Sequence, residues 1–453
     1  MNTNIVLKDK TGECKRTTKT LSNVVLKCNT GKCKGTTITL PNLKKVIVGR
    51  DEDNCTLIIP NSYKMVSRIH CSLYIDAPFV LVDDHGSTNG TLIKEYDKKK
   101  AAFDFSKTGN KKKDIQRTNN FLMKPGDKLV LGEGRINNEG EVEIESCELR
   151  LEYLNLNDYF ETVDDDFIGE GKMGFVRKVE DINTKCPMAV KMLKTKIDGV
   201  DEKNMERIKG WFLREFYNGR QLNHNNVVKY YHLGLFNNRP AIVMEYCGKS
   251  LEKLLPDIDK KTLEEKIALA TKIILQALDG IDHIHNVEAK VALADNRIYI
   301  AKGMVHRDLR PANILLMDGV LENPVVKIVD LGFTKAYETA GLTFNTFNGE
   351  ACGDWNYVPK QQVADYCFVE READIWSLFA TYYRILVGKT PKGDFSEKEK
   401  NKSANTTAID ILKMNPNIPK KLADIINKGL IDNPKIEITT AEDAKKLIME
   451  AFK

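Results

Sequence analysis

The stretch Met304-Val-His-Arg-Asp308-Leu-Arg310-Pro-Ala-Asn313-Ile-Leu, followed by Lys327-Ile-Val-Asp330-Leu-Gly332, decides the architecture of the second part of the chain. Upstream of it, Gly169-Glu-Gly-Lys-Met-Gly174-Phe-Val176 forms a G-x-G-x-x-G-x-V run. Glycines in such a run allow backbone N–H groups to approach phosphates closely. The run is weak evidence by itself, because dinucleotide-binding folds use a similar one. The interpretation therefore depends on the order and spacing of all the motifs.

The pattern of the chain changes at about Asp158. Five strands and one helix are predicted first, followed by long helices. Residues 268–281 have apolar side chains at i, i+3, i+4 and i+7, which predicts an amphipathic core helix, and residues 373–387 predict a second apolar helix.

Two further residues complete the set. Lys191 ends the run Met188-Ala-Val-Lys191, from which it could contact the α- and β-phosphates of a nucleotide. Glu215 stands on a predicted helix and could hold Lys191 through an ion pair. In this order and spacing the motifs resemble the eukaryotic-type protein kinase family over about residues 160–453.

The resemblance implies a two-lobed α+β kinase fold with ATP and Mg²⁺ bound between the lobes. Asp308 would accept or orient the proton of a substrate hydroxyl, with Arg310 beside it in the catalytic group. Asn313 and Asp330 would bind Mg²⁺. Asp374 would brace the catalytic loop, and Met244 would gate the nucleotide pocket. The residues assigned to the nucleotide are Gly169, Gly171, Gly174, Val176, Ala189, Lys191, Glu245 and Cys247.

The chain departs from the kinase pattern at several positions. Arg310 stands where serine/threonine kinases usually have Lys, and Asp354 replaces a Thr that helps to select serine and threonine acceptors. Serine/threonine specificity is the first expectation, but tyrosine or dual specificity stays open. Gly219 replaces a large apolar residue four positions after Glu215 and costs about 1 kcal/mol of helix propensity. We expect a gap there and a loosely anchored helix that needs a partner to switch on.

Other departures concern the second lobe. Lys360 and Glu437 reverse the charges of a family ion pair, so we expect the same pair with its polarity swapped. The connection from Asn286 to Gly303 is longer than usual, and we expect a surface excursion. Arg307 precedes the catalytic aspartate, and in kinases with this arginine a phosphate on the activation segment can order the loop. The candidate acceptors are Thr339, Thr343 and Thr346, with Thr343 or Thr346 preferred.

A second group of motifs occupies the first part of the chain. Short apolar alternations separated by Gly, Asn and Asp predict a sandwich of many short strands, interrupted by a long loop from Tyr96 to Asn120. Within it, Val48-Gly49-Arg50, Val66-Ser67-Arg68-Ile-His70 and His85-Gly-Ser-Thr-Asn-Gly-Thr91 resemble the forkhead-associated (FHA) domain. The resemblance implies a β-sandwich whose loops bind phosphothreonine.

Phosphate recognition needs a guanidinium and several neutral donors that converge from loops. The residues that match the binding positions of the FHA family are Arg50, Ser67, Arg68, Thr88 and Asn89. We expect His70 to be a buried residue that holds the loops rather than a phosphate contact.

The composition of the chain limits its class, its partners and its cellular compartment. With 453 residues, 42% apolar and 29% charged, the chain is globular and long enough for two or three domains. Lys and Arg (69) barely exceed Asp and Glu (64), which argues against nucleic acid as the main partner. No apolar stretch approaches a membrane span, and the N-terminus lacks a signal peptide. The ten cysteines contain no C-x-x-C pair, which argues against zinc and disulfides and favours a cytoplasmic or nuclear setting.

The N-terminus contains a repeat, in which Val6 to Leu21 matches Val25 to Leu40. It is interpreted either as a duplicated β-hairpin or as a basic, threonine-rich segment (Lys15 to Thr20) that becomes phosphorylated. The expected organisation is multidomain: a duplicated hairpin segment (1–23), an all-β FHA sandwich (24–156) and a protein kinase domain (157–453).

Two functions follow. The first is an active, ATP-dependent protein kinase whose FHA domain binds phosphothreonine on a partner or on a second copy, at Thr17, Thr18 or Thr20, and so favours autophosphorylation in trans. The FHA-then-kinase order resembles checkpoint-type kinases of the DNA-damage response. The alternative is an FHA adaptor with a weak or inactive pseudokinase, which the departures favour and the retained catalytic residues disfavour.

Overall fold

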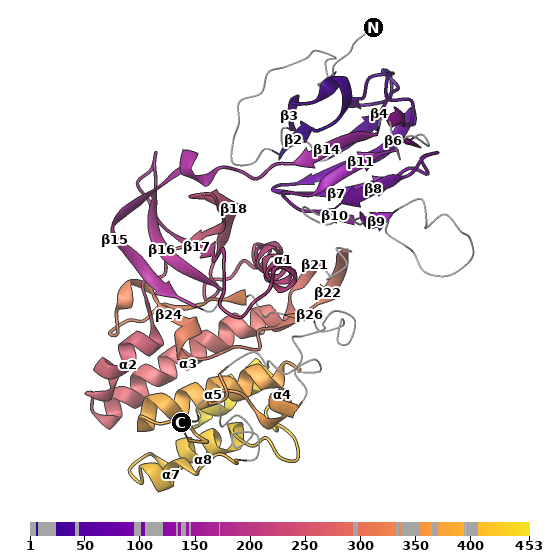
Figure 1. Ribbon diagram of the computed structural model, residues 1–453. Coiled ribbons are helices and arrows are strands. Elements are labelled where there is room, and N and C mark those ends of the chain that lie inside the picture. Colours follow the sequence, from indigo (N-terminus) through magenta and orange to yellow (C-terminus); the bar gives the residue numbers. More distant parts are fainter. Residues whose placement is uncertain are drawn as a thin grey trace.

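Short strands build the first third of the chain, and in the computed structural model they form two six-stranded sheets (Figure 1). In Val24–Cys28 and Cys147–Leu151 every second residue is buried, as strands with one face on a core require. Buried apolar side chains of both sheets meet in one core, so this unit is a β-sandwich. The structure describes residues 6–7, 24–40, 45–94, 101–104, 121–132, 135–136, 142–144, 146–171, 173–292, 298–331, 335–336, 354–364, 370–393, 395 and 406–453.

The strand order of the first sheet is β1-β5-β4-β6-β7-β10: Val6–Leu7, Leu57–Ile58, Val46–Gly49, Ile69–Asp76, Phe79–Asp84 and Phe121–Met123. The order of the second is β3-β2-β14-β11-β8-β9: Thr37–Leu40, Val24–Cys28, Cys147–Leu151, Lys128–Leu131, Thr91–Lys94 and Ala101–Asp104. A separate hairpin pairs β12 (Arg135–Ile136) with β13 (Val142–Ile144), and η1 (Gly31–Cys33) connects β2 to β3.

Two features of the sandwich refine the sequence expectations. Strand β9 pairs with β8, so the stretch predicted as one long loop from Tyr96 to Asn120 contains a strand. Strand β1, from the first copy of the repeat, pairs with β5 at the edge of the first sheet. The rest of that first copy lies outside the described residues.

The second unit begins with five antiparallel strands in the order β15-β16-β17-β19-β18: Phe160–Glu170, Gly174–Asp181, Pro187–Leu193, Arg239–Glu245 and Tyr230–Phe236. Helix α1 (Glu202–Gly219) packs beside this sheet and starts where the Asp201 side chain accepts a hydrogen bond from Asn204 N. A short 3₁₀ turn, η3 (Leu156–Asp158), connects the units, and Leu235 N donates to Leu154 O at 2.7 Å. The sequence predicted this small lobe of five strands and one helix.

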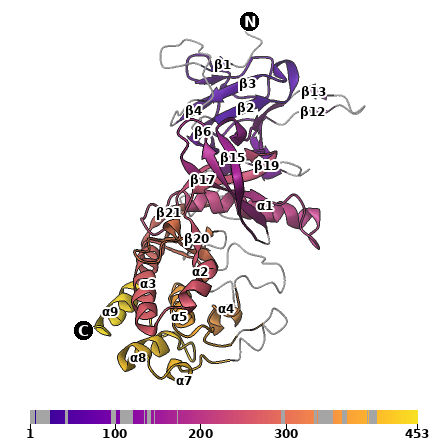
Figure 2. The ribbon, with the colours of Figure 1, turned by 90° about the vertical axis from the view of Figure 1, so that its left-hand side faces the viewer.

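The larger lobe is mainly helical and lies below the five-stranded sheet (Figure 2). Its central helix, α3 (Leu263–Asn286), is longer than the predicted run 268–281 and starts with a capping box between Thr262 and Glu265. The other helices are α2 (Leu251–Asp259), α4 (Lys360–Ala364), α5 (Glu372–Val387), α7 (Ile411–Met414), α8 (Lys420–Gly429) and α9 (Ala441–Glu450). The short elements are β20 (Lys249–Ser250), β23 (Met304–Val305), η4 (Pro311–Asn313), β24 (Ile314–Leu316), η5 (Met317–Gly319), β25 (Val326–Ile328) and β26 (Lys335–Ala336).

The insertion between Asn286 and Gly303 is not an irregular excursion. It forms an antiparallel hairpin of β21 (Glu288–Ala292) and β22 (Ile298–Lys302). This hairpin lies beside the C-terminal end of α1, where Gln221 holds the backbone of Lys290 (Figure 1).

The predicted ion pair between Lys360 and Glu437 is wrong. Both side chains are exposed, and in the described part of the chain they are not paired with each other. A buried pair replaces it: Lys392 Nζ lies 2.8 Å from Asp432 Oδ2, which also accepts a hydrogen bond from Lys360 N at 2.9 Å. Asp432 thus ties α4 to the end of α8 through the backbone of Lys360, and the side chain of Lys360 is left to solvent.

None of the helices in the described ranges has the length and apolar character needed to cross a bilayer.

Candidate active site

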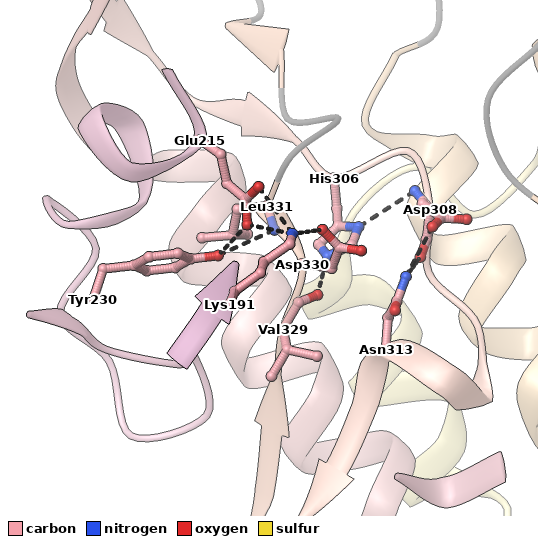
Figure 3. A network of polar contacts seen from close by, with 9 residues as sticks. All are labelled: Lys191, Glu215, Tyr230, His306, Asp308, Asn313, Val329, Asp330 and Leu331. Carbon is pink, nitrogen blue, oxygen red and sulfur yellow. Dashed lines mark hydrogen bonds and ion pairs between the residues drawn. The ribbon is translucent and has the colours of Figure 1, made fainter. Parts of the chain in front are cut away.

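A largely buried lysine links β17, helix α1 and the segment after β25 (Figure 3). Lys191 Nζ, on β17, donates to Glu215 Oε1 and Oε2 at 2.8 and 2.9 Å and to Asp330 Oδ1 at 2.9 Å. The lysine side chain is only 17% exposed. Burial by itself would lower the pKa of Lys191, but the carboxylates of Asp330 and Glu215 outweigh it and hold the pKa above the ordinary value for lysine. The side chain therefore stays charged at neutral pH.

The residue opposite Gly219 overturns the expectation of a gap. A Cβ built on Gly219 would lie 2.8 Å from Tyr230 Cε2 and 3.1 Å from Leu331 Cδ1, so the space is already filled. The Tyr230 hydroxyl donates to Glu215 Oε1 at 3.1 Å and accepts from Leu331 N at 3.4 Å. The large side chain thus comes from β18 instead of α1, and it anchors the helix that we expected to be loose.

The two residues of the catalytic stretch are bonded to each other. Asn313 Nδ2 donates to Asp308 Oδ2 at 2.9 Å and to Asp308 O at 2.7 Å. Burial, together with the nearby Asp330 carboxylate, raises the pKa of Asp308 to about 7. Arg310 Nε lies 3.6 Å from Asp308 Oδ1 and opposes that rise. A carboxylate with this pKa is suited to accept a proton near neutral pH.

Two of the departures from the family pattern lie close together. Arg310 NH1 is 3.9 Å from Asp354 Oδ2, and the same nitrogen is 3.9 Å from Glu252 Oε1. Asp354, in place of a threonine, therefore faces the arginine that stands in place of a lysine.

Asp374, at the start of α5, braces the catalytic loop from below, as the resemblance implied. Its two carboxylate oxygens accept from His306 N and Arg307 N, each at 2.8 Å, and Oδ2 also lies 2.8 Å from His285 Nε2. Arg307 has a φ of 69°, a conformation that side chains other than glycine rarely adopt. The Arg307 carbonyl accepts from Gln362 Nε2 at 2.6 Å. These bonds hold a strained backbone directly before Asp308.

The glycine-rich turn and the strand edge are placed around Lys191. Gly171 N donates to Gly174 O at 2.8 Å, and Lys194 Nζ donates to Gly171 O at 2.9 Å. Gly169 lies in β15, and Val176 in β16 pairs with Lys191. On the other side of β17, Ala189 pairs with Met244, which is partly buried.

The segment after Met244 is fixed by polar contacts. Glu245 Oε1 lies 2.8 Å from the nearly buried Lys327 Nζ of β25, so an ion pair joins the two lobes here. Cys247 is buried, and its thiol donates to Glu245 O at 3.4 Å. Burial raises the pKa of Cys247 to about 12, so the thiol stays protonated.

The residues present suit Mg²⁺, which prefers oxygen ligands. Asn313 directs its amide nitrogen to Asp308, which leaves the amide oxygen for a cation, and Asp330 supplies carboxylate oxygen nearby. Asp330 has a φ of 66°, which turns its side chain toward Lys191 and the catalytic stretch (Figure 3). Gly332 lies outside the described residues, as do the candidate phosphosites Thr339, Thr343 and Thr346.

The phosphopeptide-binding candidates converge at one end of the sandwich. Arg50 follows β4, and its backbone N donates to Arg68 O at 2.8 Å. The Arg50 guanidinium donates through Nε to Val66 O and through NH1 to Asn61 Oδ1 at 3.4 Å. Thr88 N donates to Ser67 Oγ at 3.1 Å. The side chains of Arg68 and Thr88 are exposed.

Two other residues of these loops hold neighbouring segments together. Buried His70 accepts from Ser67 N at 3.0 Å through Nδ1, and its Nε2 lies 3.1 Å from Gly90 O, so it joins two loops as predicted. Asn89 uses its amide nitrogen to hold Met65 O at 2.9 Å.

Sequence reasoning missed three residues. Asp84 accepts from Gly86 N, Ser87 N, Ser87 Oγ and Thr91 Oγ1 and so shapes the Thr88 loop. Its position two residues before the Gly86-Ser-Thr motif was the available signal. Tyr230 could have been found from the missing bulk at Gly219. Lys327 gave no signal, because its partner Glu245 is distant in the sequence.

Comparisons with known proteins agree with both halves of the molecule. Residues 162–450 match the model of the protein kinase domain, and residues 46–132 match that of the FHA domain. Among curated proteins, a probable serine/threonine-protein kinase of Clostridium perfringens is 30% identical over 278 residues, or 61% of this chain and 36% of that protein.

The serine/threonine-protein kinase SAPK2 of Oryza sativa is 27% identical over 279 residues, which cover 61% of this chain and 72% of that protein. Human serine/threonine-protein kinase STK11 is 29% identical over 239 residues, which cover 51% of this chain and 48% of that protein. The matched region covers only 36% of the Clostridium protein and 48% of human STK11, so this chain spans less than half the length of those two relatives. The kinase match alone spans well over half of the chain, and the chain therefore belongs to the protein kinase family, with an FHA domain ahead of the kinase domain.

Proposed function

We propose that this chain is an ATP-dependent protein serine/threonine kinase that uses its FHA domain to bind phosphothreonine. One observation carries the catalytic part: Lys191 lies within 2.9 Å of both Glu215 and Asp330, in the same site as the bonded pair Asp308–Asn313. A pseudokinase would have no need of this complete set, so the scaffold alternative is less well supported.

The geometry suits in-line phosphoryl transfer. Asp308 takes the proton of an acceptor hydroxyl, whose oxygen forms a bond to the γ-phosphorus while the bond to the β–γ bridging oxygen breaks and ADP leaves. Lys191, held by Glu215, positions the phosphates. Asn313 and Asp330 would hold Mg²⁺, which would neutralise charge on the phosphate oxygens. Glu245, Cys247 and Ala189 border the expected adenine position.

The phosphate-reading role is supported by exposed cationic and hydroxyl groups that converge at one end of the sandwich. Arg50 and Arg68 would supply charge, and Ser67 and Thr88 would donate hydrogen bonds. The ligand would be a phosphothreonine segment of a partner protein, or of a second copy at Thr17, Thr18 or Thr20, which would bring two kinase domains together. The scattered cysteines support a reducing compartment such as the cytoplasm.

The catalytic proposal is tested with purified full chain, Mg-ATP carrying a labelled γ-phosphate and a protein substrate. Wild type should incorporate label that an Asp308→Ala variant does not, and the labelled sites should be serine or threonine. Equal incorporation in both proteins would reject the kinase. Label confined to tyrosine would reject the serine/threonine assignment only.

A further inference from the structure

The FHA sandwich packs on the helix that carries Glu215. Along β7, Val80 and Val82 enter the sandwich core, whereas Phe79 and Leu81 face outward and join the kinase core. On β10, Leu122 likewise faces outward and joins the kinase core, whereas its neighbours Phe121 and Met123 enter the sandwich core. Phe79 is completely buried, its ring 5.1 Å from that of Tyr217 and 6.1 Å from that of Phe216, both on α1. The sheet therefore has two apolar faces, one for its own core and one for α1.

Arg220, directly after α1, closes this interface. Its guanidinium lies over the rings of Phe79, Phe216 and Tyr217, at 5.2–5.9 Å from the ring centres. NH2 lies 2.5 Å from Asp76 Oδ1, and NH1 donates to Ala77 O at 2.6 Å and to Asp76 O at 3.3 Å. One side chain thus combines stacking, an ion pair and backbone contacts to the β6–β7 turn.

The next residue, Gln221, binds the β21–β22 hairpin of the kinase insertion. Gln221 Nε2 donates to Lys290 O at 2.5 Å, and Gln221 Oε1 accepts from Lys290 N at 2.9 Å. Both polar groups of one backbone unit in β21 are therefore bound by one amide side chain. The same Nε2 donates to Tyr217 O at 3.0 Å. This gives the kinase insertion a role: the hairpin meets the end of α1 that the sandwich meets from another direction.

The clamped end of α1 is close to the catalytic ion pair. Glu215 lies five residues before Arg220, and Gly219 contacts the Tyr230 ring, whose hydroxyl bonds Glu215. Because a helix moves as a rigid element, a shift of its C-terminal turn changes the distance between Glu215 and Lys191.

The phosphopeptide loops remain at the other end of the FHA domain. Strand β6 runs from Ser67 and Arg68 to the turn at Asp76, and β7 returns to the loop that holds Thr88. Eight residues of strand span about 26 Å. Docking of the sandwich on α1 therefore leaves those loops accessible.

We propose that Arg220 and Gln221 are positioning residues of the kinase, which clamp the end of α1 between the FHA sandwich and the β21–β22 hairpin and so keep Glu215 on Lys191. The FHA domain is then an activating brace of the kinase domain in the same chain, in addition to being a reader of phosphothreonine. This inference rests on the proposed kinase function.

The test uses the full chain and three variants: Arg220→Ala, Asp76→Asn on the sandwich side, and Arg384→Ala as a matched control. Arg384 bonds Asp259 in the large lobe, away from α1. The first readout is backbone hydrogen exchange in Glu202–Gly219. The second is kcat/KM for ATP, measured in wild type and in a Glu215→Gln background.

We expect Arg220→Ala to accelerate exchange in α1 and to lower kcat/KM for ATP about tenfold, within the usual range of coupling between sites. Asp76→Asn should give a smaller effect of the same sign, and Arg384→Ala none. In the Glu215→Gln background, Arg220→Ala should cause little further loss of kcat/KM for ATP, because the arginine acts through Glu215. A merely structural residue would give the same fold loss in both backgrounds.

Two results would overturn the clamp. In the first, Arg220→Ala would behave like the control Arg384→Ala in both readouts. In the second, Arg220→Ala would lower kcat/KM for ATP by the same factor in the Glu215→Gln background as in wild type. If Arg220→Ala does not fold, Asp76→Asn decides, since it alters an exposed turn. A wild-type chain without ATP turnover would reject the proposed function, and hydrogen exchange in α1 would still decide the clamp.

Discussion

The two regions of this molecule that we propose to handle phosphate use cations in opposite ways. In the kinase domain, Lys191 is buried and already bonded to two carboxylates. At the end of the sandwich, Arg68 and Thr88 face solvent, and among the residues that the structure describes the Arg50 guanidinium bonds the neutral oxygens of Val66 and Asn61. The difference teaches that a site for transferring phosphate is assembled in advance, with its cation already paired to carboxylates. Such electrostatic interactions are stronger in the low dielectric of a partly buried site than in water. A site for reading phosphate leaves its charge for the ligand.

The strongest test of the kinase side of this comparison is the Lys191→Ala substitution. It leaves the buried Glu215 carboxylate and the partly exposed Asp330 carboxylate without their cation, and it removes the contact to the phosphates. We expect kcat/KM for ATP to fall by about 10²–10³-fold, measured by initial-rate kinetics. An activity within a few-fold of wild type would contradict the assigned role.

The second half is tested by Arg50→Ala. Hydrogen bonds to a charged group contribute about 1.5–3 kcal/mol, so affinity for a phosphothreonine peptide should fall about 10–100-fold. The measurement is calorimetric titration with the phosphorylated and unphosphorylated peptides, with Arg384→Ala as control. Equal affinity of wild type for the two peptides would refute phosphate reading.

Gly219→Ala probes how tightly the buried site is assembled. The substitution gains about 1 kcal/mol of helix propensity, but its Cβ would overlap the buried Tyr230 ring, and overpacking costs about 1–3 kcal/mol. We expect the Tyr230 hydroxyl to leave Glu215 and kcat/KM for ATP to fall several-fold, toward the value of Tyr230→Phe. A more active Gly219→Ala protein would restore the idea of a gap.

Arg310→Ala should have the smallest effect of these substitutions, which is a shift in the pH dependence of kcat/KM. Asp308 must be deprotonated to accept a proton, and its pKa is about 7, so kcat/KM should rise with pH through neutrality. Arg310 lowers that pKa, so its removal should move the rise to higher pH. Rates measured from pH 5.5 to 9 decide it, and a shift to lower pH would contradict the geometry.

Local motifs made much of this molecule predictable. Lys191, Glu215, Asp308, Asn313 and Asp330, which the structure brings into contact in two groups, could be singled out from the order and spacing of the motifs around them. The helices around 268–281 and 373–387 followed from apolar periodicity.

The failures share a physical cause: the deciding partner comes from another element and is a residue of an ordinary chemical type. Tyr230 fills the space beside Gly219 from another element, and Asp432 takes the place that we gave to Glu437. Phe79 and Arg220 carry no motif. The signal that could have revealed Phe79 is that the run Phe79-Val-Leu-Val82 is apolar on both faces, as a strand covered on both sides would be.

The most direct test of the account is one variant in two assays. Asp308→Asn keeps the shape of the site but cannot accept the proton. We predict that γ-phosphate transfer to serine or threonine falls to background, while affinity for a phosphothreonine peptide equals that of wild type. Transfer at the wild-type rate would contradict the central claim that this chain writes phosphate with one domain and reads it with the other.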